Sequence, residues 1–159
     1  VIFKRDNSTL YCNSAVQFPE TKDVHAFGNV VIQEANGATV TADTLFYSSV
    51  NNTAEMRGRV VLIDKTTRVT TNRLFYNMET KEAYYLNKGK VEENQTILTS
   101  QKGFYRSYNK TIAFKGNVVL FDPKDQQTLK TDTMTYYTDS KDAYFHSYTE
   151  IISKSGKLI

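Results

Sequence analysis

Two short motifs recur along this chain at intervals of about thirty residues, and this repetition constrains the fold more than any other feature. The first motif ends in Leu-Phe-Tyr at residues 40–47 and 69–76, with a related copy at 129–136. Two looser copies, at 12–18 and 99–105, carry one extra residue before the aromatic side chain. A fixed period of this length is typical of proteins that stack one small structural unit many times. We therefore expect a repeat fold.

The second motif has the form Gly-x-Val and lies between the copies of the first. It occurs at residues 28–32, 58–62, 89–91 and 116–120, and a degenerate copy at 147–151 begins with Ser. Because two independent motifs keep the same period, chance is a poor explanation of the repetition. The chain is interpreted as about five copies of one unit.

Each unit predicts two β-strands that are separated by polar turns. Val, Ile, Thr, Tyr and Phe recur throughout, and these residues favour strands. Clusters of turn-forming residues, such as 48–52 and 77–81, separate the motifs. No segment shows the 3.6-residue apolar period of a long helix. We predict one all-β domain over residues 1–159 with about ten or more strands. Because Val1 already lies in a predicted strand, we expect the chain to be a piece of a longer protein.

Alternation of side chains assigns an inner face to both strands. In the strand that contains Gly-x-Val, every second residue is apolar or glycine in the clear copies. Successive side chains of a strand point to opposite faces, so this set faces a core and the other set mostly faces water. In the other strand the alternation slips by one residue between Ala42 and Leu45. A bulge near Asp43 would restore it, because a bulge inserts one residue.

The motif glycines and one recurring polar position have two interpretations each. A glycine on the inner face marks a bend of the strand or leaves room for a ligand, and we favour the bend. The polar position could form a row of catalytic carboxylates, as in a carbohydrate-cleaving β-helix. However, Asn and Ser cannot act as general acids, so we favour a side-chain hydrogen bond that stabilises a turn or bulge. The polar position is occupied by Asn13, Asp43, Asn72, Ser100 and Asp132.

The sequence offers little to support catalysis or metal binding. Cys12 is the single cysteine, which excludes an intrachain disulfide and a cysteine metal site. His25 and His146 lie on the predicted outer face, and neither has a third ligand at metal spacing. The phosphate-binding and nucleophile motifs are missing. The net charge of +3 is spread evenly, without the basic patch of a nucleic-acid binder. We predict a non-enzymatic protein with no catalytic residue, metal or cofactor and no nucleic-acid partner.

The unit Gly-Asn-Val-Val-Ile followed by Val-Thr-Ala-Asp-Thr-Leu-Phe-Tyr resembles the OstA-type repeat of periplasmic lipopolysaccharide-transport proteins. The resemblance covers residues 12–151. The family includes a bridge protein, a protein anchored in the inner membrane and the N-terminal domain of the outer-membrane translocon. The richness in Tyr, Asn and Lys is typical of a Bacteroidetes member.

The resemblance implies a taco-shaped β-jellyroll of two facing antiparallel sheets around an apolar groove. It implies that the groove shields the acyl chains of lipopolysaccharide and that the domain joins related domains, or copies of itself, end to end. It also implies a periplasmic location during transport to the outer membrane. Contact with a membrane would be indirect, or through attachment of the full-length protein to the inner or outer membrane.

The inner positions of both strands, taken with the resemblance, give a predicted groove lining. The predicted lining residues are Val30, Ile32, Val40, Leu45, Tyr47, Met56, Val60, Leu62, Val69, Leu74, Tyr76, Phe114, Val118, Leu120, Leu129, Met134, Tyr136 and Phe145. One alternative from a different class stays open. A self-associating β-solenoid scaffold or adhesin would fill its interior with its own side chains and would carry no lipid.

Overall fold

The computed structural model describes residues 1–5 and 7–158, and every regular element in them is a β-strand. The all-β prediction is confirmed, with sixteen strands where about ten or more were predicted. The strands are β1 (Ile2–Arg5), β2 (Ser8–Tyr11), β3 (Ser14–Gln17), β4 (Val24–Glu34), β5 (Thr39–Ser48), β6 (Thr53–Asp64), β7 (Thr67–Asn77), β8 (Glu82–Tyr85), β9 (Gly89–Glu93), β10 (Thr96–Ser100), β11 (Lys102–Arg106), β12 (Thr111–Asp122), β13 (Gln127–Tyr137), β14 (Ala143–Phe145), β15 (Glu150–Ser153) and β16 (Gly156–Leu158).

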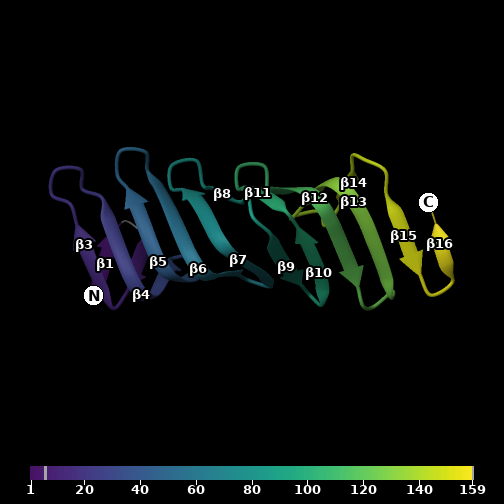
Figure 1. Ribbon diagram of the computed structural model, residues 1–159, viewed down its shortest axis with the longest axis horizontal. Helices are drawn as coiled ribbons and strands as arrows, with labels where there is room; N and C mark the ends of the chain where they lie inside the picture. Colours follow the sequence, from purple (N-terminus) through teal and green to yellow (C-terminus); the bar gives the residue numbers. More distant parts are fainter. Residues whose placement is uncertain (6, 159) are drawn as a thin grey trace.

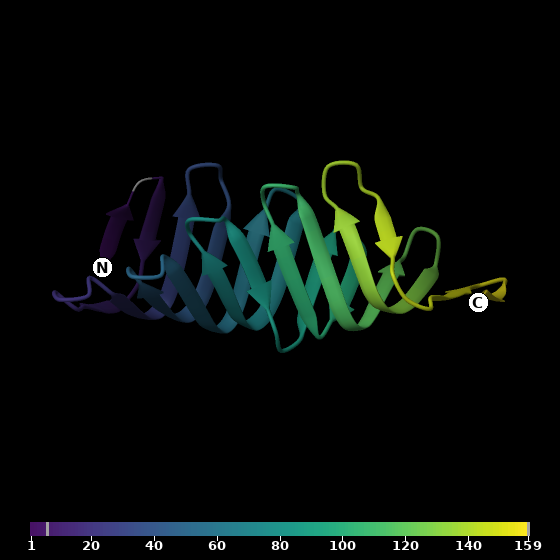
Figure 2. The ribbon, with the colours of Figure 1, turned by 90° about the horizontal axis from the view of Figure 1, so that it is seen from above.

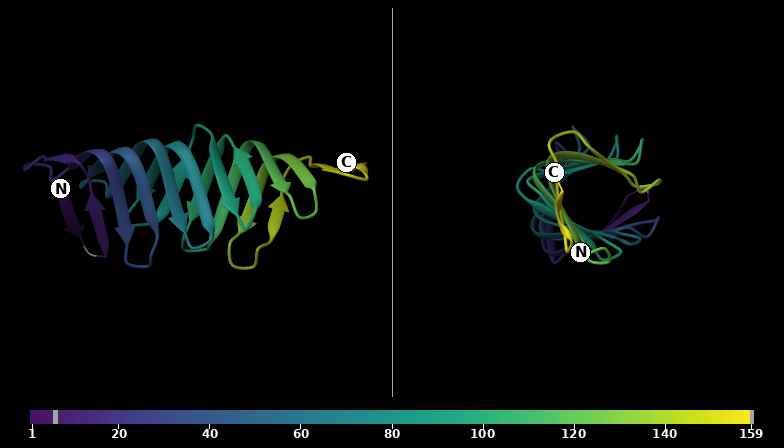
Figure 3. Two further views of the ribbon diagram at one scale, coloured as in Figure 1. Left: turned by 90° about the horizontal axis from the view of Figure 1, so that it is seen from below. Right: turned by 90° about the vertical axis from the view of Figure 1, so that its right-hand side faces the viewer.

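Antiparallel pairing joins these strands into one sheet, and the sheet is folded along its length (Figure 1). Six long strands of 10 to 12 residues bend near their middle. In four of them, β4, β7, β12 and β13, the two halves pair on one side with two different short strands. Seen end-on, the sheet curves around a central space (Figure 3, right). The two facing sheets that the family resemblance implied are therefore the two halves of one sheet.

We name the two halves wall 1 and wall 2. Wall 1 consists of residues 24–27, 44–48, 53–57, 73–77, 111–115 and 133–137 of the long strands, together with β3, β8, β11 and β14. Wall 2 consists of residues 30–34, 39–42, 60–64, 67–71, 118–122 and 127–131, together with β1, β2, β9, β10, β15 and β16.

The bend between the walls is built at the start of the Gly-x-Val motif. Gly28 and Asn29 both have positive φ angles, of 74° and 47°, and Gly58 and Arg59 repeat this pattern. The strand register shifts there, because two residues of the glycine strand face one residue, Asp43, of β5. The extra residue therefore lies in the glycine strand and not beside Asp43 in its own strand, where the sequence had placed it. Positive φ explains this, because glycine adopts it without steric cost.

The corner contact predicts that Gly58 is much less replaceable than a glycine in an open turn. A Cβ atom at Gly58 would lie 2.3 Å from Asp43 Oδ2, whereas a Cβ at Gly37 would meet nothing within 4 Å. Both glycines have positive φ. We expect Gly58→Ala to lower the free energy of unfolding by about 3 kcal/mol and Gly37→Ala by about 1 kcal/mol. Urea denaturation measures both losses, and equal losses would contradict a steric role for the corner.

Two of the recurring polar residues, Asp43 and Asn13, lie over the glycines of these corners, as the structural interpretation of the motif predicted. The Asp43 carboxylate accepts a hydrogen bond from Arg59 Nε at 3.0 Å, and this bond holds the pKa of the carboxyl below its usual value. Asn13 occupies the same place over Gly28, and its Oδ1 lies 3.4 Å from Asn29 Nδ2. These side chains therefore cover the bend and do not form a row of acids.

The looser copies of the first motif differ at the corner. In each of these copies the chain forms two short strands in place of one long strand. The first copy lies at the break between β2 and β3, and the second at the break between β10 and β11. In the second of these copies Gln101 packs over Gly116, and its N–H donates to Gly116 O at 2.9 Å. The corner residue there is Gln101 and not Ser100, which is buried. The predicted alignment was wrong by one residue because the insertion precedes the polar side chain.

Two apolar clusters fill the space next to the bend. The N-terminal cluster includes Ala26, Val30, Leu45, Met56, Val60, Leu74 and Tyr85. The C-terminal cluster includes Val91, Leu98, Ile112, Phe114, Val118 and Met134. The two chain ends lie at opposite ends of the long axis (Figure 2). In the part of the chain that the structure describes, no helix is long and apolar enough to cross a membrane.

Candidate functional site

An open groove of about 1050 Å³ lies between wall 1 and wall 2. Its interior is mainly apolar, and its mouth is bordered by the turns that connect the strands. The apolar and aromatic residues of its interior include Ile32, Val40, Met56, Leu62, Val69, Leu74, Tyr76, Ala83, Tyr85, Val91, Tyr105 and Ile112. The groove is therefore large enough for the tail of an amphipathic molecule, with polar groups where that molecule would meet water.

The structure places the predicted lining residues in four environments. Those on the groove wall are Ile32, Val40, Met56, Leu62, Val69, Leu74 and Tyr76. Those packed in or against the N-terminal cluster without reaching the groove are Val30, Leu45, Tyr47 and Val60. Those packed in or against the C-terminal cluster are Phe114, Val118, Leu120, Met134 and Tyr136. Leu129 pairs with Leu120 and is half-buried, whereas Phe145, on edge strand β14, is 38% exposed.

Tyr85 and Tyr105 line the groove although the predicted lining did not include them. The Tyr85 ring fills a notch between two glycines, since a Cβ at Gly89 or Gly103 would lie within 2.4 Å of it. Its hydroxyl lies 2.7 Å from Ser100 Oγ, and burial raises the pKa of Tyr85. Tyr105 ends its copy of the first motif as Tyr47 and Tyr76 end theirs, so the repeat alone could have added it to the predicted lining.

Two tyrosines of wall 1 interact electrostatically with carboxylates of wall 2 at the mouth. Burial is the main cause of the raised pKa of Tyr76, and the charge of Glu34 raises this pKa further. The pKa of Tyr105 is also raised, mainly by burial and further by the charge of Asp64. Each tyrosine therefore places its ring in the apolar interior and its hydroxyl at the polar mouth, a common arrangement for this side chain.

Charged residues of the turns complete the mouth, and the sequence interpretation did not single them out. The charged residues on the wall 2 side are Arg5, Glu34, Asp64, Lys65 and Glu93, and those on the wall 1 side are Lys81, Lys110, Asp139 and Lys141. Their roughly thirty-residue spacing was a third periodic signal in the turns. It could have been found by aligning the turns as well as the strands.

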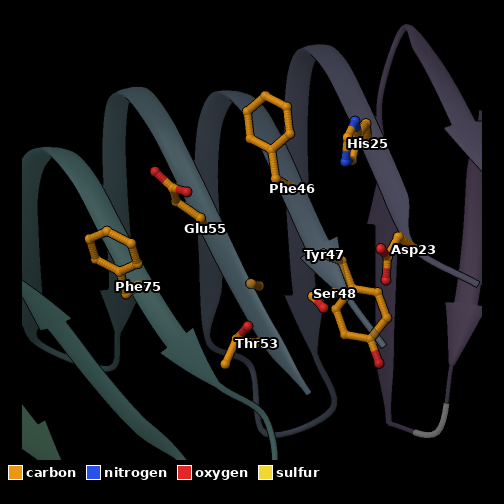
Figure 4. Close-up of a pocket in the computed structure, with 9 residues that line it drawn as sticks. Asp23, His25, Phe46, Tyr47, Ser48, Thr53, Glu55 and Phe75 are labelled. Atoms are coloured by element: carbon orange, nitrogen blue, oxygen red, sulfur yellow. The ribbon is translucent and has the colours of Figure 1, made fainter. Parts of the chain in front are cut away.

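A smaller hollow of about 230 Å³ lies on the outer face of wall 1 (Figure 4). Phe46 and Phe75 flank Glu55 there, which suggests a stacking platform. However, the Arg57 guanidinium lies 4.8 Å from the Phe46 ring centroid, and Arg73 covers Phe75 at the same distance. Glu55 accepts hydrogen bonds from both arginines, and the bond from Arg57 is the main cause of its lowered pKa. Arg57 and Arg73 of the chain itself therefore cover the two phenylalanine rings and pair with the Glu55 carboxylate.

The remaining residues considered for chemistry lie apart from one another. His25 lies on the outer face between two phenylalanine rings, and His146 Nε2 lies 2.9 Å from Thr135 Oγ1. Cys12 is buried. Across residues 1–5 and 7–158, no three His, Cys, Asp or Glu side chains gather in a way that could hold a metal ion. The groove is therefore the candidate site.

The fold and the groove define an all-β protein in which one bent antiparallel sheet encloses an elongated apolar space. The family model for OstA-like proteins matches residues 1–132, and the chain therefore belongs to the OstA-like protein family. No curated protein matches the chain.

Solved structures show the same fold. Among nineteen matching chains is the crystal structure of LptH from Pseudomonas aeruginosa, described as the LptA-homologous periplasmic component of the conserved lipopolysaccharide transport device. It matches with a TM-score of 0.64 and 14% sequence identity, over 71% of this chain and 84% of LptH. The predicted jellyroll is confirmed by this likeness.

Proposed function

We propose that the chain is a periplasmic carrier module that shields the acyl chains of lipopolysaccharide in its groove. The observation that carries the proposal is the open groove of about 1050 Å³, with an apolar interior and a charged mouth. Transfer of an acyl chain from water to such a surface is favourable by roughly 0.8 kcal/mol per CH₂. The headgroup would remain at the mouth, in water. Membership of the OstA-like family supports this assignment.

The module would carry its ligand without making or breaking covalent bonds. Its binding surface consists of aliphatic and aromatic side chains, and release requires only that the ligand leave the groove. A scaffold with a fully packed interior, the alternative class, does not account for an open groove between the walls.

The two ends of the sheet support a further part of the proposal, which is end-to-end assembly. In the described chain, β1 and β3 at the N-terminal end and β14 and β16 at the C-terminal end each pair on one side only. An unpaired strand edge accepts another strand through main-chain hydrogen bonds. Related domains, or copies of this chain, would extend the sheet there and continue the groove. Association with membranes would then be indirect, through such neighbours.

Photo-crosslinking tests the assignment of the groove with two adjacent aromatic residues on β7. Tyr76 lies on the groove wall, whereas Phe75 lines the hollow on the outer face. A photoreactive phenylalanine analogue is placed at either position, and the protein is irradiated in cells. We expect lipopolysaccharide adducts from position 76 and not from position 75. Adducts from position 75 alone, or from neither position, would contradict the proposal.

A further inference from the structure

Four equivalent groups of three residues span the mouth of the groove, and we call them rim sets. Each contains a charged residue of wall 2, a tyrosine of wall 1 and the positive-φ residue that follows this tyrosine by five positions. Rim set 1 is Arg5, Tyr47 and Asn52, rim set 2 is Glu34, Tyr76 and Lys81, rim set 3 is Asp64, Tyr105 and Lys110, and rim set 4 is Glu93, Tyr136 and Lys141. The sets therefore repeat one geometry along the mouth.

Rim set 4 is closed by bonds that cross the mouth. Glu93 belongs to wall 2 and accepts hydrogen bonds from two wall 1 groups, Lys141 Nζ and, at 3.3 Å, the Tyr136 hydroxyl. The Glu93 side chain is only 14% exposed. The bond to Glu93 is also the main cause of the raised pKa of Lys141. These contacts join residues 43 and 48 positions apart and hold the two walls together.

Rim set 1 is closed in the same way at the other end. The guanidinium of Arg5 donates a hydrogen bond to the Tyr47 hydroxyl and lies 5.1 Å from the centroid of its ring. The Tyr47 hydroxyl in turn donates to Asn52 Oδ1 at 3.0 Å. The two end sets therefore connect the walls although their charged residues differ in sign.

Rim sets 2 and 3 contain the same kinds of side chain, but the hydrogen bonds of Glu34 and Lys110 join residues of one wall and do not cross the mouth. In rim set 2, Glu34 accepts a hydrogen bond at 2.7 Å from Ser8 of its own wall. In rim set 3, Lys110 donates at 2.8 Å to Asp139 of its own wall. Within the described residues, no hydrogen bond joins Tyr76 to Glu34 or Tyr105 to Asp64, although each carboxylate is close enough to raise the pKa of its tyrosine. Rim sets 2 and 3 are therefore open.

The extent of the groove agrees with this division. The tyrosines of the open sets, Tyr76 and Tyr105, line the groove, whereas those of the closed sets, Tyr47 and Tyr136, do not. Leu62 and Leu120 differ in the same way, although they hold equivalent positions of the repeat. Each follows its motif glycine by four residues. Leu62 lies on the groove wall and Leu120 packs against the C-terminal cluster beyond rim set 4. The groove therefore lies between the open sets and is bordered at its ends by the closed sets, through Arg5, Asn52, Glu93 and Lys141.

We propose that the rim sets form a zipper, in which open sets 2 and 3 are the entry window for acyl chains and closed set 4 is a gate to the C-terminal end of the groove. This inference rests on the proposed carrier function. Acyl chains enter over Tyr76 and Tyr105, and they pass to the next domain only when Glu93 releases Lys141 and Tyr136. Because all four sets share one geometry, an open set closes over a bound chain by the contacts seen in set 4.

The gate is tested first without lipid, by the distance between the two rims. Nitroxide labels are placed on cysteines at Asn94 and Ser140, exposed turn residues of opposite walls, in a Cys12→Ala background. We expect Glu93→Ala to lengthen and broaden the distance measured by pulsed electron paramagnetic resonance. Glu92→Ala is the matched control, because Glu92 pairs with Arg68 and Lys90 and not across the mouth. An unchanged distance in Glu93→Ala would overturn the zipper.

The second test follows the lipid, with purified lipopolysaccharide as the probe and a photoreactive residue at Leu62 or Leu120. We expect adducts from position 62 alone in the parent chain, and from both positions in Glu93→Ala. Adducts from both positions in the parent chain would overturn the gate and leave the carrier function standing. A lack of adducts at position 62 in every variant would instead overturn the carrier function.

Discussion

Leu62→Glu is expected to abolish the binding of acyl chains while the chain still folds. Leu62 lies on the groove wall between Val40 and Val69 of the neighbouring strands. In the empty groove a carboxylate at this position stays hydrated, so the fold tolerates it. When acyl chains displace that water, the unpaired charge costs several kcal/mol, which corresponds to an affinity loss of about a hundredfold or more.

Ile63→Glu is the matched control for this substitution. Ile63 is the next residue of β6, so its side chain points to the opposite face, where it is 39% exposed. The Ile63→Glu substitution introduces the same charge one residue away, on a side chain that does not reach the groove. Binding of purified lipopolysaccharide is measured for both variants, and circular dichroism confirms their strand content. Equal binding by the two variants would show that the groove is not where the acyl chains bind.

Phe114→Ala is expected to lower the free energy of unfolding by about 3–5 kcal/mol, the usual range for removing a fully buried aromatic ring. Phe114 is 1% exposed and belongs to the buried part of the C-terminal cluster. Its strand neighbours are Met134 on one side and Gly103 on the other. Because Gly103 has no side chain, it cannot fill the cavity left by the ring.

Phe121→Ala provides the comparison on the same strand. Phe121 is also on β12 but is 39% exposed, so its loss is expected to cost about 0.5–1 kcal/mol. Urea denaturation of both variants separates the two positions. Similar losses would mean that the cluster around Phe114 does not contribute more to stability than the outer face.

The fold was largely predictable because it is periodic and because its rules are local. Alternation placed Val30, Met56 and Val60 on the inner face, where they are buried. The same rule predicted the slip between Ala42 and Leu45. It could not tell which of two paired strands contains the extra residue, because the pattern within one strand does not report how many residues the partner places opposite it. The φ angles of Gly28 and Asn29 decide that question.

The candidate site was predicted less completely. Alternation identified the inner face but could not separate the groove surface, such as Leu62, from the packed interior, such as Leu120. Tyr105 was left out of the predicted lining although it ends the copy of the motif at residues 99–105. The charged rim was missed because its residues lie in turns, where neither alternation nor an apolar pattern marks them.

The sequence by itself determined the repeat, the strands and the inner face, since each depends on residues within one or two strands. Only the tertiary structure decided where the interior is open. Tyr76 and Tyr136 hold the same position of the repeat, yet Tyr76 lines the groove and Tyr136 is bonded to Glu93 across the mouth. The physical reason is that the distance between the walls depends on contacts between residues more than forty positions apart, which a strand's own pattern does not encode.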